Sequence, residues 1–262
     1  ASFLKPSARV QYHLTRRHMN LGMRYSSNIG GAPAGDMFVV GTSKNSWHKV
    51  GEQIGAFIVF VNKTFSETGE VTLNSPHWND EPSVDFNLLS DRRDLERLMD
   101  AIRRLAPLYS DPAMQSVASN SFPAAYSDKV RQVGAITTKN KILTGIAAKL
   151  LDGPKFLRDY LIENFLMEDF SLEEVCNDDD KAEAFIRRAA VGVWHASCTC
   201  RMGSENDPMA VTDNQGRVRG IAGLRVVDAS IFPVVPCANT NFPTIMTAEK
   251  IADTILKERS GN

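Results

Sequence analysis

The first third of the chain alternates short apolar runs with turn residues, which is typical of β-strands. The runs MFVVGTS at 37–43 and IGAFIVFVNKTF at 54–65 are rich in β-branched and aromatic residues, the types that strands favour. In segment 66–76, apolar and polar residues alternate after Gly69, which predicts a hairpin with its turn at that glycine. We therefore expect strands and turns in the first third.

The middle of the chain changes to the apolar spacing of amphipathic helices. In segment 91–106 a capping residue precedes a single apolar stripe, and we expect the helix to end before Pro107. The stripe consists of Leu95, Leu98, Met99, Ile102 and Leu105. Residues 140–166 predict two shorter helices with a break at 153–154, and a further helix is expected over 178–190.

The last third returns to strand patterns and closes with a helix. Segment 210–220 predicts a turn-linked pair of strands, and segment 223–230 predicts a buried strand that ends at Asp228. A closing helix is expected over 243–257, where a proline occupies the first turn. The residues expected on its buried side are Ile245, Met246, Ala248, Ile251, Ala252, Ile255 and Leu256.

The composition is that of an ordinary globular protein of one or two domains. The 262 residues include 30 basic and 31 acidic side chains, with a net charge of −1, so we expect neither nucleic acid nor a membrane as a partner. Lys5 and Pro6 interrupt the segment where a signal peptide requires an apolar run. Four cysteines are too few for a disulfide framework. We therefore expect a cytoplasmic protein with small, neutral partners.

The stretch VGVWHASCTCRMG at 191–203 places His195 close to two cysteines. A zinc site is weakly supported, because a C-x-C beside one histidine lacks the second ligand pair of a structural site. A hydrogen-bonded core histidine suits the apolar neighbours, and an acid/base catalyst suits the chemistry of imidazole. The stretch alone does not decide between these interpretations.

A second unusual stretch, PCANTNFPTIMTAEKIAD at 236–253, places three polar residues directly before the closing helix. Asn239, Thr240 and Asn241 can act as simple helix caps. They can also direct side chains and free backbone N–H groups toward a ligand. The stretch therefore adds a second candidate binding region.

Three separated motifs together resemble a known family. In order and spacing, WHASCTCRMG, DNQGRVRGIAGLRVVDASIFP and ANTNFPTIMTAEKIAD are similar to the C-terminal portion of the glucose-methanol-choline (GMC) family of FAD-dependent alcohol oxidoreductases. SETGEVTLNSP followed by VDFNLLSDRRDLERL resembles the segment that leads into the substrate domain of the family. Within the family, the Trp-His pair and an Asn as the second catalytic residue resemble the branch that acts on 5-(hydroxymethyl)furfural and aryl alcohols.

The resemblance implies the C-terminal half of an α+β fold. An antiparallel-sheet substrate domain with helices would occupy residues 1–189, with 1–25 near the FAD domain. Residues 190–262 would form the last strand and helix of a Rossmann-like FAD domain and carry the catalytic residues. The G-x-G-x-x-G phosphate loop of the family is absent from the sequence, and NIGGAPAGD at 28–36 lacks the strand-turn-helix frame of such a loop. We therefore expect a complementary N-terminal polypeptide that carries the loop.

The resemblance also assigns site residues. His195 is similar to the active-site base of the family, and Asn239 to the His or Asn that partners it across the substrate. Trp194 would lie beside the flavin and, with Val193, line the substrate pocket. The residues expected to contact FAD are Trp194, His195, Asp228, Ala229, Asn239 and Thr240. A metal is not expected, and for Asp228 a plain turn carboxylate is the open alternative.

The implied reaction is the oxidation of a primary aromatic or furanic alcohol to an aldehyde, and further to the acid, with O2 as electron acceptor. The alcohol must lose a proton from oxygen and a hydride from carbon. In the family the histidine takes the proton, the asparagine holds the alcohol oxygen, and FAD takes the hydride. Two other functions stay open: a hydroxynitrile lyase-like enzyme of the same fold, and a non-catalytic metal-binding or interaction module around Cys198 and Cys200.

Cys198 departs from the family pattern, because it stands where the family usually has glycine. We therefore expect a stiffer or re-routed loop after His195. The side chain itself is interpreted as packing, because nothing in the sequence predicts a thiolate.

Overall fold

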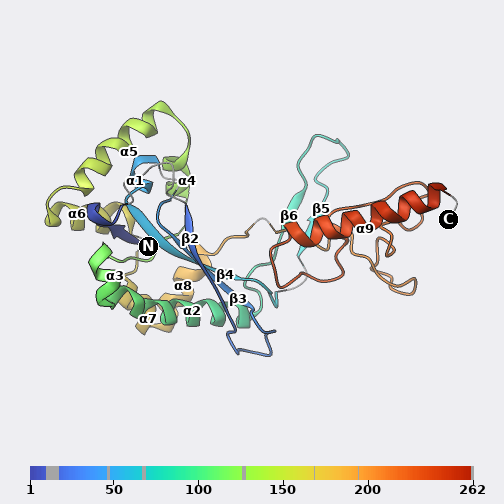
Figure 1. The fold of residues 1–262 in the computed structure, drawn as a ribbon, viewed down its shortest axis with the longest axis horizontal. Helices are drawn as coiled ribbons and strands as arrows, with labels where there is room; N and C mark the ends of the chain where they lie inside the picture. The colour runs from blue at the N-terminus through green and yellow to red at the C-terminus, as the bar shows by residue number, and fades with distance from the viewer. Residues whose placement is uncertain are drawn as a thin grey trace. The chain divides into compact units, whose positions relative to one another are not determined.

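The chain separates into two compact units in the computed structural model. Unit 1 comprises Ala1–Val61 and Arg92–Val191, and unit 2 comprises Asn62–Asp91 and Gly192–Asn262. Figure 1 follows the chain by colour from blue to red. The structure describes residues 1–9, 18–45, 48–66, 69–125, 128–167, 169–193 and 195–260. The assignment of 1–189 and 190–262 to a substrate domain and a FAD domain stays a prediction.

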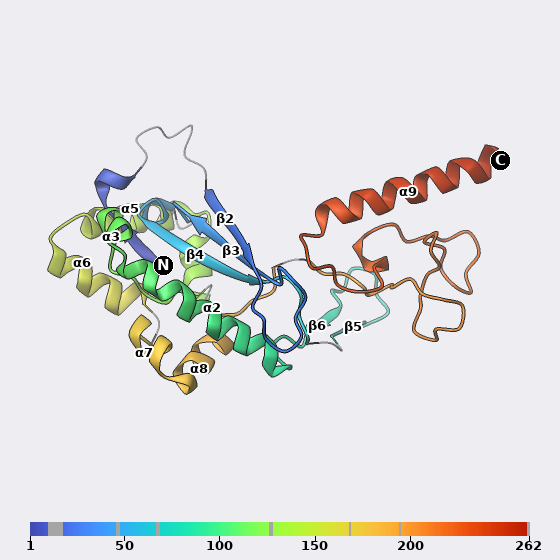
Figure 2. The ribbon, with the colours of Figure 1, turned by 60° about the horizontal axis from the view of Figure 1, so that its bottom comes forward.

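Unit 1 contains a five-stranded antiparallel sheet with the strand order β2-β3-β4-β1-β7. Its strands are β1 (Ser2–Leu4), β2 (Met19–Tyr25), β3 (Met37–Thr42), β4 (Ile54–Val61) and β7 (Ala118–Ser119). β3 and β4 pair along their length, with Val39 opposite Val59, and Figure 2 shows β2, β3 and β4 side by side. The strands predicted at 37–43 and 54–65 are confirmed.

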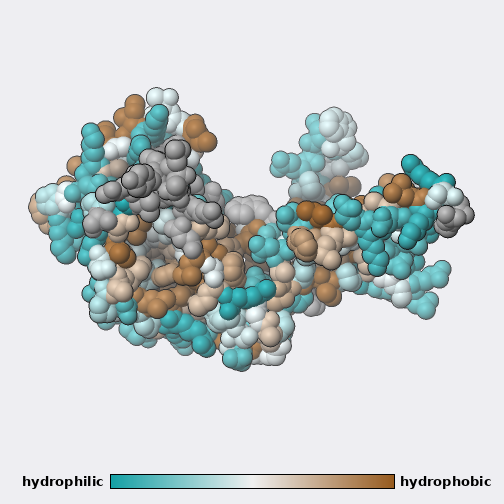
Figure 3. Space-filling view, viewed as in Figure 1, coloured by the Kyte–Doolittle hydropathy of each residue, from teal (hydrophilic) through white to brown (hydrophobic). Residues whose placement is uncertain are grey.

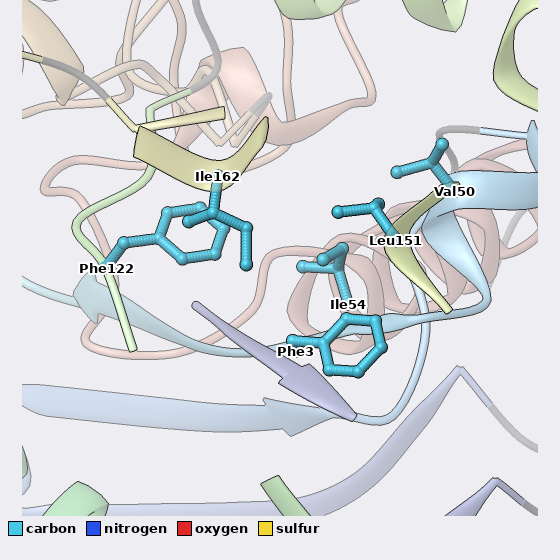
Figure 4. Packing of buried hydrophobic residues seen from close by; sticks show 6 residues of the cluster. All are labelled: Phe3, Val50, Ile54, Phe122, Leu151 and Ile162. Carbon is cyan, nitrogen blue, oxygen red and sulfur yellow. The ribbon is translucent and has the colours of Figure 1, made fainter. Parts of the chain in front are cut away.

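Helices make up the rest of unit 1. They are α1 (His48–Gly51), α2 (Arg92–Ser110), α3 (Pro112–Val117), α4 (Asp128–Gly134), α5 (Thr138–Leu151), α6 (Lys155–Leu161), α7 (Leu172–Asn177) and α8 (Asp179–Ala189), with a 3-10 turn at Pro6–Ala8 and a π-helical turn at Ile162–Leu166. The helices predicted within 140–166 and over 178–190 are confirmed. The main core consists of Phe3, Val50, Ile54, Phe122, Leu151 and Ile162 (Figure 4). It joins the centre of the sheet to α5 and the π-helical turn.

Helix α2 continues through Pro107, so the prediction that it ends before this proline is wrong. Proline lacks the N–H that would bond to the carbonyl one turn earlier, which weakens a helix. Packing offsets this loss, because Tyr109 in the last turn contacts Phe57 of β4 edge-on, with 5.5 Å between ring centroids. Burial raises the pKa of Tyr109 to about 12, which reflects this enclosed position.

A buried ion network ties the loop between β2 and β3 to α2. The side chains of Arg97 and Asp36 are both 0% exposed, and Arg97 Nη1 lies 3.0 Å from Asp36 Oδ2. Arg97 also pairs with Asp94 one turn earlier in the helix. Ser27 donates to Asp36 through its backbone N–H at 2.8 Å and through its hydroxyl at 2.7 Å. Each carboxylate oxygen of Asp36 therefore has a donor, as a buried charge requires.

Unit 2 begins with a short hairpin, formed by β5 (Glu70–Thr72) and β6 (Ser83–Asp85). Its connection spans residues 73–82, so the prediction of a turn at Gly69 is wrong. A Cβ atom at Gly69 would lie 2.8 Å from the carbonyl oxygen of Asp85. The glycine thus permits a close approach of two backbones instead of a turn.

The rest of unit 2 is mostly irregular, with a 3-10 turn at Ala229–Ile231 and the long helix α9 (Asn241–Ser260). The closing helix is confirmed. The strand pair at 210–220 is reduced to an isolated bridge between Thr212 and Val218. The buried strand at 223–230 is also wrong, because Leu224 is 46% and Val227 is 38% exposed. A buried strand needs neighbours on both edges, and the described part of unit 2 gives this segment one bridge, to Arg217.

Across the described ranges, the structure contains no helix with the combination of length and apolarity that crossing a membrane requires.

Candidate active site

The segment after His195 is held by the 3-10 turn that follows Asp228. Three backbone N–H groups donate to carbonyls of the turn: Cys198 to Ala229 at 3.2 Å, Cys200 to Ser230 at 2.9 Å, and Met202 to Ile231 at 2.8 Å. The two motifs are distant in sequence but form one hydrogen-bonded piece. The structure thus places the predicted FAD contact Ala229 directly against the loop of the predicted base.

Asp228 caps the 3-10 turn. Its Oδ1 accepts hydrogen bonds from the backbone N–H of Ser230 at 2.8 Å and from the hydroxyl of Ser230 at 2.5 Å. The residue is exposed, and its Oδ2 has no hydrogen-bond donor among the described residues. This geometry agrees with the plain turn carboxylate and also leaves one oxygen for a ligand, so both interpretations of Asp228 stay open.

A small apolar core joins these motifs to α9. It consists of Ile231, Phe232 and Ile251, and the partly buried residues that pack against it are Cys198, Met202, Val226, Ala229 and Ile255. All three motifs contribute to this core. Figure 2 shows α9 lying along the irregular part of unit 2. Apolar burial is the main driving force of folding, so this core stabilises the contacts among the three motifs.

Cys198 has a backbone conformation that glycine adopts more readily than other residues. Its φ of 72° lies in the left-handed region, which costs non-glycine residues roughly 1–2 kcal/mol. The expectation of a stiffer or re-routed loop after His195 stays a prediction. Its side chain packs against the small core, which confirms the packing interpretation.

The four cysteines form no disulfide bond and are half-buried: Cys176, Cys198, Cys200 and Cys237. Within the described parts of the chain, no group of three or more His, Cys, Asp or Glu residues is arranged to hold a metal ion.

His195 and Asn239 are both exposed. In the described portion of the chain, neither side chain makes a hydrogen bond or an ion pair. Val193 is half-buried, and Trp194 lies outside the described residues. His195 is therefore not the hydrogen-bonded core histidine that the sequence left open.

The start of α9 offers free hydrogen-bond donors. The carbonyl of Thr240 accepts the N–H of Thr244 at 3.0 Å and its hydroxyl at 2.7 Å. The N–H groups of Asn241 and Phe242 have no acceptor in the described chain, as is usual for a first helical turn. These N–H groups and the exposed amide of Asn239 form a compact set of donors.

The opposite end of α9 is anchored by an ion pair cluster that the sequence did not reveal. Glu258 binds Arg225 Nη2 at 2.5 Å and also pairs with Arg217. Arg225 donates in addition to the carbonyl of Gln215 at 3.0 Å. The alternation of basic residues in RVRGIAGLR and the acidic residue near the chain's end were the available signal, but their pairing depends on the fold.

A hollow of about 630 Å3 in unit 2 lies between Met202, Asp213, Arg219 and Pro233. None of the predicted site residues lines it. The predicted catalytic side chains of His195 and Asn239 are both exposed and lie outside this hollow.

Two curated relatives are similar to this chain in sequence. The 5-(hydroxymethyl)furfural oxidase of Methylovorus sp. (strain MP688) is 37% identical over 92% of the chain. The oxygen-dependent choline dehydrogenase of Photobacterium profundum is 31% identical over 72% of the chain. The matched regions span 38% and 25% of these relatives, so the chain covers well under half of their length.

A solved structure confirms the fold. Pyridoxine 4-oxidase from Mesorbium loti matches 97% of the chain and 40% of its own, with a TM-score of 0.62 at 18% identity. Residues 65–248 match the family described as GMC oxidoreductase, whose members are FAD-binding flavoproteins. The predicted α+β class, with helices and an antiparallel sheet, is confirmed. The chain belongs to the GMC oxidoreductase family.

Proposed function

We propose that this chain forms the catalytic C-terminal part of an FAD-dependent oxidoreductase that oxidises a primary aromatic or furanic alcohol to an aldehyde. The observation that carries the proposal is the small core of unit 2, because it unites the three family motifs in one folded piece. The 37% identity to a 5-(hydroxymethyl)furfural oxidase supports the substrate class.

The donor set of unit 2 fits FAD. The start of α9 presents unpaired N–H groups and the positive end of a 20-residue helix, which suits an electron-rich or negatively charged group. The cap at Asp228 leaves one carboxylate oxygen for a ligand. We propose that Asp228 and Ala229 contact the diphosphate part of the cofactor, and that Trp194, His195, Asn239 and Thr240 contact the flavin ring.

His195 is the proposed base. An alcohol hydroxyl is a very weak acid, so a side chain must accept its proton as the hydride leaves. Imidazole is the side chain that ordinarily accepts a proton near neutral pH. The imidazole of His195 is exposed and has no hydrogen bond to another described residue, which leaves it available for the hydroxyl of a substrate.

Asn239 is the proposed positioning group for the alcohol oxygen. Its amide cannot take the proton but can hold the oxygen so that the reacting carbon faces the acceptor. FAD, when bound, supplies the hydride acceptor. Val193 and Trp194 are the proposed walls of the substrate pocket. Water can add to the aldehyde product, and oxidation of that hydrate at the same groups would give the acid.

The proposed activity needs residues beyond this chain. The sequence lacks a G-x-G-x-x-G loop in a strand-turn-helix frame, and the chain spans 38% of the furfural oxidase relative. We propose that a complementary N-terminal polypeptide supplies this loop and that O2 reoxidises the cofactor. In this arrangement residues 1–189 form most of the substrate domain and 190–262 the last section of the FAD domain.

His195→Gln in the complete enzyme tests the proposal. We expect reduction of the flavin by 5-(hydroxymethyl)furfural to slow by about 10²- to 10⁴-fold, while the visible FAD absorbance per protein stays unchanged. Stopped-flow absorbance spectroscopy measures both. His77→Gln is the matched control, because His77 is another exposed histidine of unit 2, and it should leave the rate unaltered.

Two results would contradict the proposal. Near-normal flavin reduction in the His195→Gln enzyme would exclude His195 as the base. Rapid reduction by choline but not by aromatic or furanic alcohols would keep the family chemistry and overturn the substrate class.

A further inference from the structure

Lys63 connects the segment after β4 to the loop that carries Asn239. Its Nζ donates a hydrogen bond to the carbonyl oxygen of Val235 at 3.2 Å in a partly buried position. Val235 lies on the loop between the 3-10 turn and α9, shortly before Asn239. We infer that Lys63 is a positioning residue that fixes this loop and through it the amide of Asn239. The inference rests on the proposed function, in which Asn239 holds the alcohol.

The loop 233–239 is short of backbone hydrogen bonds. Pro233 and Pro236 have no backbone N–H to donate. The loop is held at its ends, by Phe232 in the small core and by α9, and Cys237 makes an interaction of its own within it. The Lys63 hydrogen bond to Val235 is a further restraint in this loop and reduces its conformational freedom.

The segment that carries Lys63 makes a further hydrogen bond within unit 2. Three residues after Lys63, the hydroxyl of Ser66 accepts the backbone N–H of Asp91 at 3.2 Å. Lys63 makes no ion pair with a described residue. Its ammonium therefore donates to the carbonyl of Val235 and not to a carboxylate. The ammonium has further N–H donors, but its one defined protein acceptor among the described residues is on the Asn239 loop.

Loss of the hydrogen bond between Lys63 and Val235 should lower the rate of flavin reduction more than the affinity for the alcohol. Without it the loop samples more conformations, and only those with the amide of Asn239 beside the alcohol oxygen lead to reaction. A misplacement of about 1 Å can slow an enzymatic step by about 100-fold. The diphosphate contacts proposed at Asp228 and Ala229 precede Ile231 and Phe232 of the small core in sequence, whereas Val235 follows them. We therefore expect these contacts to keep FAD bound without Lys63, although the flavin contacts proposed at Asn239 and Thr240 lie close to the Lys63 hydrogen bond in sequence.

The test uses the complete FAD-loaded enzyme. Lys63→Met, which keeps the aliphatic stem and removes the donor, is expected to slow flavin reduction by alcohol about 10- to 100-fold, with little change in KM and FAD content. Lys63→Arg keeps a donor and should restore most of the rate. Lys250→Met removes a different lysine of unit 2, which is exposed on α9, and should leave the rate unchanged.

A double mutant tests whether Lys63 acts through Asn239. In an Asn239→Ala background, Lys63→Met should have no further effect on flavin reduction, because the loop no longer carries the amide. Multiplicative losses, or loss of bound FAD in the Lys63→Met enzyme, would overturn the inference. If Asn239→Ala slows the reaction and Lys63→Met does not, the inference alone fails. If Asn239→Ala itself has no effect, the proposed role of Asn239 fails, and the inference fails with it.

Discussion

The two units of the chain differ in how completely each buries its own apolar surface. Unit 1 has a six-residue main core and a fully enclosed ion network around Arg97. Unit 2 carries the family motifs, but in its described part the core has three buried residues, Ile231, Phe232 and Ile251. Because buried apolar area is the main source of stability, unit 1 is the more self-sufficient of the two. The proposed catalytic residues thus lie in the unit that buries less apolar surface of its own among the described residues.

Helix α9 shows this difference most clearly. Its predicted buried face is wrong for Ala252, which is exposed, and for Ile245, Met246 and Leu256, which are 51%, 57% and 62% exposed. Phe242 is 70% exposed. Figure 3 shows apolar surface toward the N-terminal end of the helix. Ile251 alone is fully buried among the described residues of the helix. A helix with apolar residues on several sides is normally enclosed by other elements, which supports the proposed complementary polypeptide.

The largest expected effect comes from the ion network of unit 1. Arg97→Ala would leave Asp36 and Asp94 buried without their partner, and we expect the free energy of unfolding to fall by about 3–5 kcal/mol. Urea denaturation followed by circular dichroism measures it. Arg104→Ala is the control, since its pair with Asp100 is exposed and should cost less than about 1 kcal/mol. Equal costs would mean that unit 1 does not depend on this network.

The core of unit 2 should be nearly as sensitive. Ile231 is fully buried, and Ile231→Ala is expected to cost about 2–5 kcal/mol. Hydrogen exchange should show earlier loss of protection in α9 than in α2, because the two helices belong to different units. Leu224→Ala, at an exposed leucine, should change little. If α9 and α2 lost protection from exchange at the same time, the two units would unfold as one cooperative unit, and the difference in stability between them would be contradicted.

Acid should weaken unit 1 through Asp36. Burial raises the pKa of this carboxyl, but hydrogen bonds from Ser27 and Arg97 together hold it below its ordinary value of 3.8. The stabilisation by ionised Asp36 is therefore complete above pH 3.8 and is lost as the pH falls through the lowered native pKa. The difference in free energy of unfolding between wild type and Asp36→Asn, measured by urea titration at several pH values, should shrink below pH 3.8. If this difference in free energy of unfolding stayed constant with pH, the lowered pKa of Asp36 would be contradicted.

The smallest effect is expected at Cys198. Cys198→Gly relieves the left-handed backbone but adds freedom to the unfolded chain and removes a packing contact. We expect a net gain of up to about 1 kcal/mol in thermal unfolding experiments. Cys200→Gly, at a residue without a positive φ, should instead lose about 0.5–1 kcal/mol. If both variants lose stability equally, the backbone strain at Cys198 is not significant.

Helices and strands that depend on neighbouring residues could be predicted from the sequence. Features that depend on contacts between residues far apart in the chain could not. The two helices on either side of residues 153–154 follow from spacing, caps and breakers. In contrast, α2 passes through Pro107 because Tyr109 packs on Phe57, a contact that no local pattern contains. Gly69 suggested a turn, but its role depends on the backbone of Asp85.

The candidate site divides in the same way. The sequence identified His195, Asp228 and Asn239 as candidates through motif resemblance, and their roles stay predictions. It could not show that Asp228 uses one oxygen to accept from Ser230. Nor could it show that Lys63 reaches Val235, because the two residues are far apart in the chain.

The sequence by itself determined the family, the composition of the three motifs and most helices, because these depend on residues close together in the chain. Tertiary structure decided the left-handed conformation of Cys198, the burial of Arg97 with Asp36, and the pairing of the His195 loop with the turn after Asp228. These features arise from contacts between distant segments. Such contacts stabilise the protein only after folding has brought those segments together, so a local sequence pattern does not predict them.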